Sequence, residues 1–415
     1  MKTQHCQVAI VGAGPSGLAL ASELAKSDLD VVVLEREDTA GGIPRHCGHS
    51  PYGMREFHRL MSGPAYAGRL TREAEQQGAR IWLNTTVTEI GPGGKLLLST
   101  VDGVLKLQAA RVVICTGNRE TPRAARLVSG TRPLGIVTTG ALQSMVYLKH
   151  RLPFMNPLIV GTELVSFSAL LTCRHAGIKP VAMIDSNPRV TAIKASTWLP
   201  RLLGIPLLLN AVLDEIRGGS RVESVAVSNA AGTLQNIECD GVIFSGNFVA
   251  EASLVRASHL EFDARSGGPV VDQYGRCSDP AYFACGNLLH PVDTAGWCWA
   301  EGLRTARLLL ADLNTALPRT GRVLEIETAS PGIRYFTPQR ILLPDAHLSE
   351  NHPGVQLRFV ENRSGRISWW GDKGIISGRR IRAQRERRVL LPFPPRDQLS
   401  ACASLALEFL PDVED

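Results

Sequence analysis

Three glycines and one acid near the N-terminus have the types and spacing of a phosphate-binding turn. They lie in VAIVGAGPSGLALASELAKSDLDVVVLE, residues 8–35. Gly12 permits a tight turn, Gly14 lets the backbone approach a pyrophosphate, and Gly17 lets a helix pack closely against a sheet. Glu35 ends the stretch, where its carboxylate can accept hydrogen bonds from both hydroxyls of a ribose. The pattern predicts an adenine dinucleotide site.

The elements that must position these residues are a strand over Val8–Val11, a helix that begins at Pro15 and Ser16, and a strand over Val31–Leu34. The N-terminal N–H groups and the macrodipole of such a helix favour an anion. The alternative is a glycine-rich strand-to-helix turn in an unrelated α/β protein. The acid in register after the second strand, Glu35, favours the dinucleotide site.

Two further turns follow apolar strands, so we expect them at the same edge of the sheet. The strand Val112–Cys115 runs into Thr116 and Gly117, and the segment YFAC runs into Gly286 and Asn287. A helix is expected to begin near Thr294 and to direct its N-terminus at the same ligand. The other residues assigned to this site are Arg36, Gly42, Arg45, Val87 and Ala295.

The loop over residues 36–63 holds side chains that can do acid–base chemistry. They are Arg45, His46, Cys47 and His49. Histidine exchanges protons near neutral pH, and arginine stabilises developing negative charge. In the equally weighted alternative, Arg45 pairs with a phosphate or a neighbouring acid and the histidines are hydrogen-bonded loop residues. Cys47 is a weaker candidate nucleophile because no base stands beside it.

A second strand–helix–strand unit begins at Pro157 and has a spoiled glycine pattern. A helix is predicted over Thr162–Ala176, and the following strand ends at Asp185. Glu163 and Ser166 stand where the second and third glycines would be. A carboxylate at the pyrophosphate position opposes phosphate. We therefore expect a retained fold unit without a functional nucleotide site, and the less favoured alternative is an NAD(P)H site.

Composition excludes several classes of protein. The chain has 415 residues, a formal charge of +6 and interspersed acids and bases, so nucleic acid is not an expected partner. Nine cysteines are scattered singly, which argues against a metal site, an iron–sulfur cluster and a disulfide framework. No apolar run is long enough for a transmembrane helix, and the first strand begins too soon for a signal peptide. We expect a cytoplasmic location.

The C-terminal part of the chain has a different character. From about residue 320 the predicted helices stop, and short β-prone segments are separated by glycine and proline. The segment Gly378–Arg388 is locally basic and includes Arg379, Arg380 and Arg382. We expect a partner-docking patch here, with a solvated strand face as an alternative of equal weight.

With these motifs in this order, the chain resembles the two-dinucleotide-domain flavoproteins of the glutathione-reductase fold. The resemblance rests on GAGPSG, Glu35, the pair Gly41-Gly42, Cys115–Gly117 and Tyr282–Asn287. It implies FAD in the first unit and places the loop after the glycine pair beside the isoalloxazine. Asn287 departs from the acid usual in the family, and Cys47 stands alone, so dithiol chemistry is not expected.

A narrower resemblance comes from GGIPRHCGHSPYGMREF, VGTELVSFSALLTCRHAG and GNLLHPVDTAGWCWAEG. These segments look like the FAD-binding subunits of heteromeric bacterial dehydrogenases, such as opine oxidase, hydrogen cyanide synthase and D-hydroxyproline dehydrogenase. The resemblance implies a hetero-oligomer with a small [2Fe–2S] protein and with an amino-acid-oxidase-like flavoprotein subunit. Only Cys402 lies near the C-terminus, so a cluster would belong to a separate subunit.

Together these patterns predict an α/β fold with two Rossmann-like dinucleotide-binding domains, the second inserted in the first, and a small β-rich C-terminal domain. The expected boundaries are 1–120 with 240–318, 121–239, and 319–415. The expected function is an FAD-dependent oxidoreductase subunit of a dehydrogenase that oxidises an amino acid, opine, hydroxyproline or related amine. Its FAD would relay electrons between a partner flavoprotein and an iron–sulfur or quinone acceptor. The alternative is a self-sufficient NAD(P)H-dependent reductase of a small redox protein.

Overall fold

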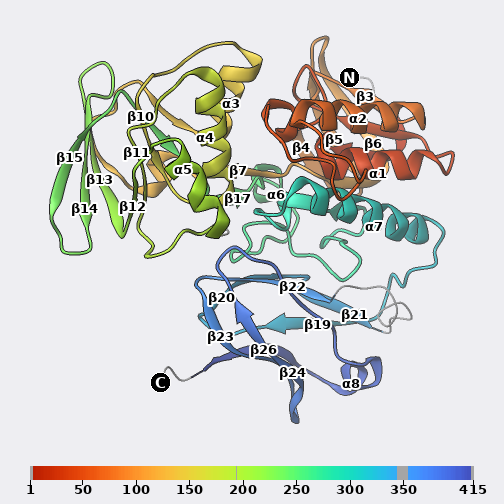
Figure 1. Cartoon of the computed structure of the whole chain (residues 1–415). Helices are drawn as coiled ribbons and strands as arrows, with labels where there is room; N and C mark the ends of the chain where they lie inside the picture. The colour runs from red at the N-terminus through yellow and green to blue at the C-terminus, as the bar shows by residue number, and fades with distance from the viewer. Residues whose placement is uncertain (1–2, 193, 344–353, 413–415) are drawn as a thin grey trace. The chain divides into compact units, whose positions relative to one another are not determined.

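The chain folds into two compact units, and Figure 1 colours it from red to blue along the sequence. The structure is a computed structural model that describes residues 3–192, 194–343 and 354–412. The first unit contains residues 1–42, 67–118 and 250–415, and the second contains residues 43–66 and 119–249. The chain passes between the units at residues 42/43 and 66/67, and again in the paired strands β7 (Asn118–Glu120) and β17 (Phe248–Ala250).

A parallel sheet with the order β3-β2-β1-β6-β18 forms the base of the first unit. Its strands are β1 (Thr3–Val11), β2 (Val31–Leu34), β3 (Arg80–Trp82), β6 (Gly103–Ile114) and β18 (Tyr282–Ala284). The hairpin of β4 (Thr86–Gly91) and β5 (Lys95–Thr100) pairs antiparallel with the first half of β6. The expected dinucleotide-binding fold is confirmed here.

The strands β2 and β18 and the carboxyl-terminal ends of β1 and β6 are buried on both faces, which explains their continuous apolar sequences. Val8–Val11 pair with Val31–Leu34 on one side and with Arg111–Ile114 on the other. Residues 8–11 are at most 5% exposed. Because all these strands are parallel, their carboxyl ends meet at one edge of the sheet.

Helices pack on this sheet. They are α1 (Pro15–Ala25), α2 (Gly63–Gln76), α6 (Ser253–Arg256) and α7 (Ala295–Leu313), with the short turn η5 (Gly286–Leu288); the short turn η1 (Ile43–His46) belongs to the second unit. The contact between α1 and α7 is close because Gly302 has no side chain. A Cβ at Gly302 would lie 2.3 Å from the carbonyl oxygen of Ser16. The first turn of α1 is therefore held against the interior of α7.

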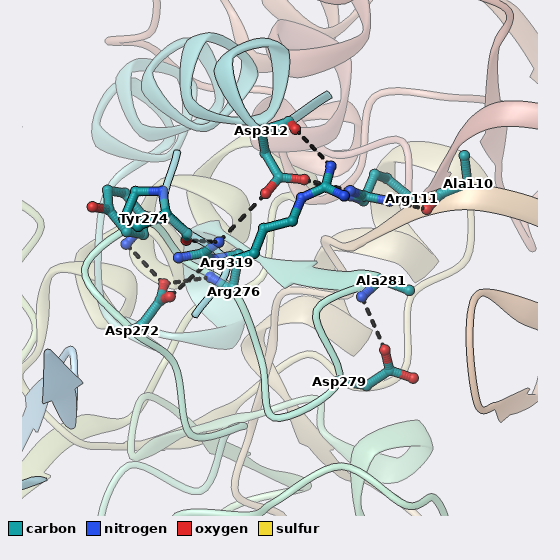
Figure 2. A network of polar contacts seen from close by, with 10 residues as sticks. Ala110, Arg111, Asp272, Tyr274, Arg276, Asp279, Ala281, Asp312 and Arg319 are labelled. Carbon is teal, nitrogen blue, oxygen red and sulfur yellow. Dashed lines mark hydrogen bonds and ion pairs between the residues drawn. The ribbon is translucent and has the colours of Figure 1, made fainter. Parts of the chain in front are cut away.

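A buried ion-pair network anchors the far end of α7 (Figure 2). Asp312 accepts from Arg111 of β6 at 2.7 Å, and Arg276 lies 3.4 Å from it. Arg276 also donates to Asp272 at 2.9 Å, and Arg319 donates to the Asp312 carbonyl at 3.0 Å. The side chains of Arg276 and Asp312 are at most 4% exposed. These charges are buried and paired, so we assign them a structural role.

The second unit contains a parallel sheet of order β12-β11-β10-β16-β9 and an antiparallel-rich sheet of order β15-β14-β13-β8. The first has β9 (Ile136–Thr138), β10 (Pro157–Val160), β11 (Ala182–Asp185), β12 (Leu207–Leu209) and β16 (Gly241–Phe244). The second has β8 (Ser129–Gly130), β13 (Ala211–Arg217), β14 (Ser224–Asn229) and β15 (Leu234–Glu238). The helices are α3 (Thr139–Gln143), α4 (Leu164–Ala176) and α5 (Trp198–Leu202), with the 3-10 turns η2 (Arg123–Arg126) and η4 (Lys194–Thr197) and the π-helical turn η3 (Ser144–Leu148).

The predicted second strand–helix–strand unit is present as β10, α4 and β11. The helix begins at Leu164 rather than at Thr162, because Glu163 has an extended backbone at the N-cap position. The second compact unit extends to residue 249, beyond the expected domain boundary at residue 239. The reason is that β16 pairs with β10 and β9, so the chain leaves the second sheet only after it. Residues 43–66 group with the same unit.

The C-terminal region is built of strands, as predicted. One sheet has the order β21-β19-β26-β23-β24 and the other the order β20-β22-β25. The strands are β19 (Arg322–Glu327), β20 (Ile333–Thr337), β21 (Arg340–Leu343), β22 (Val355–Phe359), β23 (Arg363–Gly371), β24 (Gly374–Ala383), β25 (Val389–Leu391) and β26 (Leu405–Pro411). The expectation that helices stop was wrong at α8 (Arg396–Ala401), where Pro395 and Asp397 provide a helix start.

Within the described ranges, no helix is both long and apolar enough to cross a membrane.

Candidate functional site

The predicted cofactor residues of the first unit gather at the carboxyl edge of its parallel sheet. Gly12 follows β1, Glu35 follows β2, Thr116 and Gly117 come after β6, and Gly286 comes after β18. These residues are far apart in sequence, and the strand order alone brings them together. The edge is where open α/β sheets bind their ligands.

The three glycines of the first turn have three different surroundings. A Cβ at Gly17 would lie 2.0 Å from the Gly12 carbonyl oxygen, and one at Gly12, where φ is +107°, would lie 2.6 Å from the Cys115 carbonyl oxygen. A Cβ at Gly14 would meet nothing within 4 Å. Gly12 and Gly17 therefore serve packing, whereas Gly14 leaves space open in front of α1.

The open space lies before helix N-termini that no side chain caps. Gly14 is the N-cap of α1 and Thr294 is the N-cap of α7, and neither has a side-chain cap hydrogen bond. Pro15 is in the first turn of α1, and Ser16 and Gly17 are buried. The two helix ends therefore offer N–H groups and partial positive charge to an anion.

Glu35 is oriented by the backbone of the first turn. Its side chain is buried and accepts hydrogen bonds from the Ala13 amide at 2.9 Å and the Glu37 amide at 3.0 Å. The glycine pair lies against the same turn, since a Cβ at Gly42 would be 2.8 Å from the Gly14 Cα. Glu35, Gly14 and Gly42 thus converge at this turn, and their binding of a ribose and a pyrophosphate stays a prediction.

The remaining predicted residues of the first unit lie around this turn with different surroundings. Thr116 donates its hydroxyl proton to the Glu251 carbonyl at 2.7 Å, and Gly117 has a φ of +76°. Val87 on β4 belongs to the hydrophobic core and is 7% exposed. Arg36 is exposed, with Glu37 3.7 Å away. Of these four residues, only Arg36 has an exposed charge to offer a phosphate.

The turn of Gly286 and Asn287 is held by its own neighbours. Asn287 donates to the Asp293 carbonyl and accepts from the Asp293 amide, both at 3.0 Å. Its side chain therefore closes the 287–293 loop, a role that the sequence did not predict. A Cβ at Gly286 would lie 2.5 Å from Ser16 Oγ, so the turn presses against the start of α1.

Glu301 on α7 is a residue of this site that the sequence interpretation missed. Its Oε2 accepts from the Gly286 amide at 3.0 Å, and His290 and Arg304 each lie 3.2 Å from Oε1. Burial acts to raise the pKa of Glu301, but His290, Arg304 and the Gly286 amide outweigh it, so the pKa is lowered. The turn is therefore fixed by an ionised carboxylate.

A second missed contact joins the C-terminal region to the start of α7. Arg358 of β22 pairs with Asp293, and Gln356 donates to the same carboxylate at 3.0 Å. The side chain of Arg358 is 1% exposed and that of Asp293 is 8% exposed. Because Asp293 directly precedes the N-cap of α7, this buried pair ties the C-terminal strands to the predicted cofactor site.

The residues of the first unit fit a flavin dinucleotide. An open cradle at Gly14, two uncapped helix N-termini and an oriented Glu35 are suited to a pyrophosphate and a ribose. A side chain at Gly14 would project into that space. FAD would be held at this edge, with the N-terminus of α7 available to stabilise negative charge.

Arg45, His46, Cys47 and His49 belong to the second unit, where the last two join a hydrogen-bonded chain. Cys47 donates to Gln143 at 3.3 Å, Gln143 donates to Ser168 at 2.7 Å, and Ser168 contacts His49 Nε2. Arg45 and His46 lie in η1 and are partly buried. The acid–base role of these four residues stays a prediction.

Cys47 is poorly suited to nucleophilic attack. Burial raises the pKa of its thiol to about 11, with smaller opposing contributions from Tyr52 and Gln143. The thiolate is the reactive form, so Cys47 is almost entirely protonated near neutral pH.

The second unit differs from the first where the pyrophosphate would lie. Gly161 retains a φ of +118°, but the carboxylate of Glu163 accepts from the Asn247 amide at 2.8 Å. This carboxylate lies against Gly246, whose Cβ would be 2.2 Å from Glu163 Cδ. Ser166 replaces the third glycine and is fully buried. Where the first unit has Gly14 with open space beside it, the second unit has Glu163, whose carboxylate lies against Gly246 and Asn247.

The second unit nevertheless keeps the geometry of a ribose-binding acid. Asp185 is buried and accepts from the Asn187 amide at 2.9 Å, as Glu35 accepts from the Glu37 amide. Thr162 donates its hydroxyl to Asp185. A second carboxylate, Glu120, accepts from the Gly246 amide at 3.1 Å, and burial raises its pKa.

Comparison with known proteins gives relatives of two kinds. An opine oxidase subunit of Rhizobium meliloti is 26% identical over 195 residues, which cover 47% of this chain and 42% of that protein. Ferredoxin–NADP reductase of Picrophilus torridus is 24% identical over 293 residues, which cover 67% of this chain and 84% of that enzyme. The crystal structure of T. acidophilum thioredoxin reductase aligns with a TM-score of 0.64 and 23% identity, covering 75% of this chain and 99% of that one.

The matched segment spans less than half of the opine oxidase protein, and the likeness to the solved structure concerns the fold. The family model for pyridine nucleotide-disulphide oxidoreductases matches residues 6–307, which is most of the chain. The chain therefore belongs to the pyridine nucleotide-disulphide oxidoreductase family and is an FAD-dependent oxidoreductase.

Proposed function

We propose that this chain is the FAD-containing subunit of a multi-subunit dehydrogenase that oxidises an amino acid, an opine, hydroxyproline or a related amine. In this assembly it relays electrons between a partner flavoprotein and an iron–sulfur or quinone acceptor. Sequence similarity to opine oxidase subunits and to the alpha subunit of sarcosine oxidase supports the proposal, because these relatives are named as parts of larger enzymes. The residues that bind FAD are proposed to be those at the edge of the first sheet.

The observation that carries the proposal is the carboxylate of Glu163 beside Gly246 in the second unit. Like charges about 4 Å apart repel by about 4 kcal/mol at an effective dielectric constant of about 20. Arg126 donates to the Gly246 carbonyl at 2.8 Å and offsets part of this repulsion, but the ionised Glu163 still opposes a pyrophosphate at this place. Electrons would then have to reach the FAD from a protein partner rather than from a pyridine nucleotide.

The chain's own residues would hold the cofactor and stabilise charge on it. Bound FAD supplies two-electron and one-electron redox chemistry, which permits exchange between a substrate-reduced flavin and a one-electron acceptor. Gly14 and the first turn of α1 would bind the pyrophosphate, and Glu35 would bind the ribose hydroxyls. The N-terminus of α7, fixed by Glu301 and Asp293, would stabilise negative charge that accumulates on reduction.

The second candidate is a self-sufficient NAD(P)H-dependent reductase of a small redox protein. Two observations favour it: the match to ferredoxin–NADP reductase over most of that enzyme, and the ribose-binding geometry of Asp185. The blocked position at Glu163 opposes it. We prefer the role in a multi-subunit dehydrogenase because a pyridine nucleotide needs its pyrophosphate site.

Purification of the full chain from its native source under mild conditions tests the proposal. We expect co-purification of a second flavoprotein and a small iron–sulfur protein, and bleaching of the flavin when an opine, hydroxyproline or N-methylated amino acid is added. A chain that purifies alone and whose flavin is reduced by NAD(P)H would establish the reductase instead.

A cytoplasmic location is part of the proposal. Its support is the scattered single cysteines, which are typical of a reducing compartment.

A further inference from the structure

The outer face of the β23–β24 hairpin gathers arginines from two strands. β24 is the edge strand of its sheet and pairs antiparallel with β23. Arg366 lies directly opposite Arg380, and Ser364 lies opposite Arg382. Directly opposed residues and residues two apart share one face of a sheet, so Arg366, Arg380 and Arg382 point to the same side.

Arg379 lies on the other face of the same strand. It is opposite Ile367, which is fully buried in the core of the C-terminal region, and its guanidinium donates to the Leu390 carbonyl. The basic segment of the sequence is thus divided by the sheet, and Arg366 from β23 takes the place that the sequence interpretation gave to Arg379. We call Arg366, Arg380 and Arg382 the arginine face.

The charges of the arginine face are incompletely balanced within the chain. Arg380 pairs with Asp412 at 2.8 Å, while Arg366 and Arg382 have no ion-pair partner among residues 3–192, 194–343 and 354–412. The same side of the sheet also carries Glu408 of β26, which is half-buried, and Glu327 of β19, which pairs with Ala406. Like charges directly opposite one another destabilise a sheet, so Arg366 and Arg380 repel each other, and an anionic partner would reduce this repulsion.

The face also has an apolar contact point. Leu410 of β26 lies directly opposite Arg366 and is 52% exposed. Arginine is enriched in protein interfaces, and the buried core of an interface is more apolar than the rest of the surface. Guanidinium groups form paired hydrogen bonds with carboxylates, which gives geometric specificity for Asp and Glu.

We infer that the arginine face docks an acidic protein surface, rich in Asp and Glu, of a partner subunit. The inference rests on the proposed function, which supplies the partner. An anionic membrane is a less favoured partner because membrane-binding clusters usually hold about four to eight basic residues, whereas the arginine face has three. Nucleic acid is weaker because the chain as a whole carries 39 acids against 45 basic residues.

The test compares two triple charge reversals in the full-length, FAD-loaded chain. The first is R366E/R380E/R382E. The matched control, R201E/R217E/R307E, makes the same change of charge at exposed arginines outside the C-terminal region. Association with the separated partner subunits is measured at several salt concentrations. We expect the first variant to bind at least about tenfold more weakly at low salt, with a flatter salt dependence, and the control to bind like the starting protein.

A glutamate-rich peptide, anionic phosphatidylserine vesicles and duplex DNA serve as probes of the starting protein. Binding of the peptide that is lost in R366E/R380E/R382E supports the inference even if no partner subunit co-purifies, so failure of the proposed function is seen separately. Unchanged partner and peptide binding by R366E/R380E/R382E overturns the inference. Tighter binding to vesicles or DNA than to the peptide also overturns it.

Discussion

The buried pair of Arg358 and Asp293 gives a quantitative test of how the C-terminal strands support the start of α7. Removing one partner of a buried ion pair leaves an unpaired charge and costs about 3–5 kcal/mol. We expect R358M and D293N each to lower the free energy of unfolding by about 3 kcal/mol, because both side chains are less than a tenth exposed. The double variant D293N/R358M should lose much less than the sum, with a coupling energy of about 2–3 kcal/mol.

The assay is urea unfolding at saturating FAD, followed by flavin release and by far-UV circular dichroism. Fixed FAD matters because bound ligand adds to apparent stability. The control is the exposed pair of Arg380 and Asp412, whose side chains are 76% and 37% exposed, so R380Q should lose less than about 1 kcal/mol. Losses from R358M and D293N that add to within about 0.5 kcal/mol in the double variant would refute the proposed coupling.

Three further predictions concern the first turn, Glu301 and Cys47. G17A should prevent stable FAD binding because the added Cβ would be 2.0 Å from a carbonyl oxygen. G14A should fold normally and only weaken FAD binding, because its Cβ would meet nothing within 4 Å. Equal folding and equal FAD content in the two variants would contradict this prediction. Folding lowers the pKa of Glu301, so the ionised Glu301 carboxylate should stabilise the protein fully above about pH 4.3, and this stabilisation should be lost as the pH falls below that value. The difference in unfolding free energy between the starting protein and E301Q measures the stabilisation. A difference that grows on acidification would contradict the prediction. Cys47 should react slowly with iodoacetamide near neutral pH and faster by about tenfold for each pH unit up to about 11, and rapid alkylation of the folded protein near neutral pH would contradict its burial.

The sequence was informative wherever function depends on local pattern. Alternation of apolar runs with glycine turns predicted β1, α1 and β2. The position of Glu35 directly after the second strand predicted that its carboxylate lies at the first turn, where it accepts from the Ala13 amide. Glu163 stands where the motif would have its second glycine, and this also predicted a changed second site, because a single carboxylate in the turn changes its charge and its space. These features involve residues close in sequence, whose geometry follows from backbone preferences.

The sequence could not predict contacts that depend on tertiary packing. Arg358 and Asp293 are 65 residues apart, and nothing in either local pattern marks them as a pair. Glu301 lies on a helix whose apolar spacing is unremarkable, and its role is visible only once the Gly286 amide is placed before it. The division of Arg379 from Arg380 likewise depends on strand register, which composition does not encode.

Reduction by pyridine nucleotides tests the central claim most directly. The isolated FAD-loaded chain is mixed with NADH or NADPH in a stopped-flow instrument, and dithionite shows separately that the flavin can be reduced. With Glu163 in the second site, we predict that the visible flavin band persists with either nucleotide and bleaches with dithionite. Rapid bleaching by NADH or NADPH would contradict the account and assign the chain to the self-sufficient reductases.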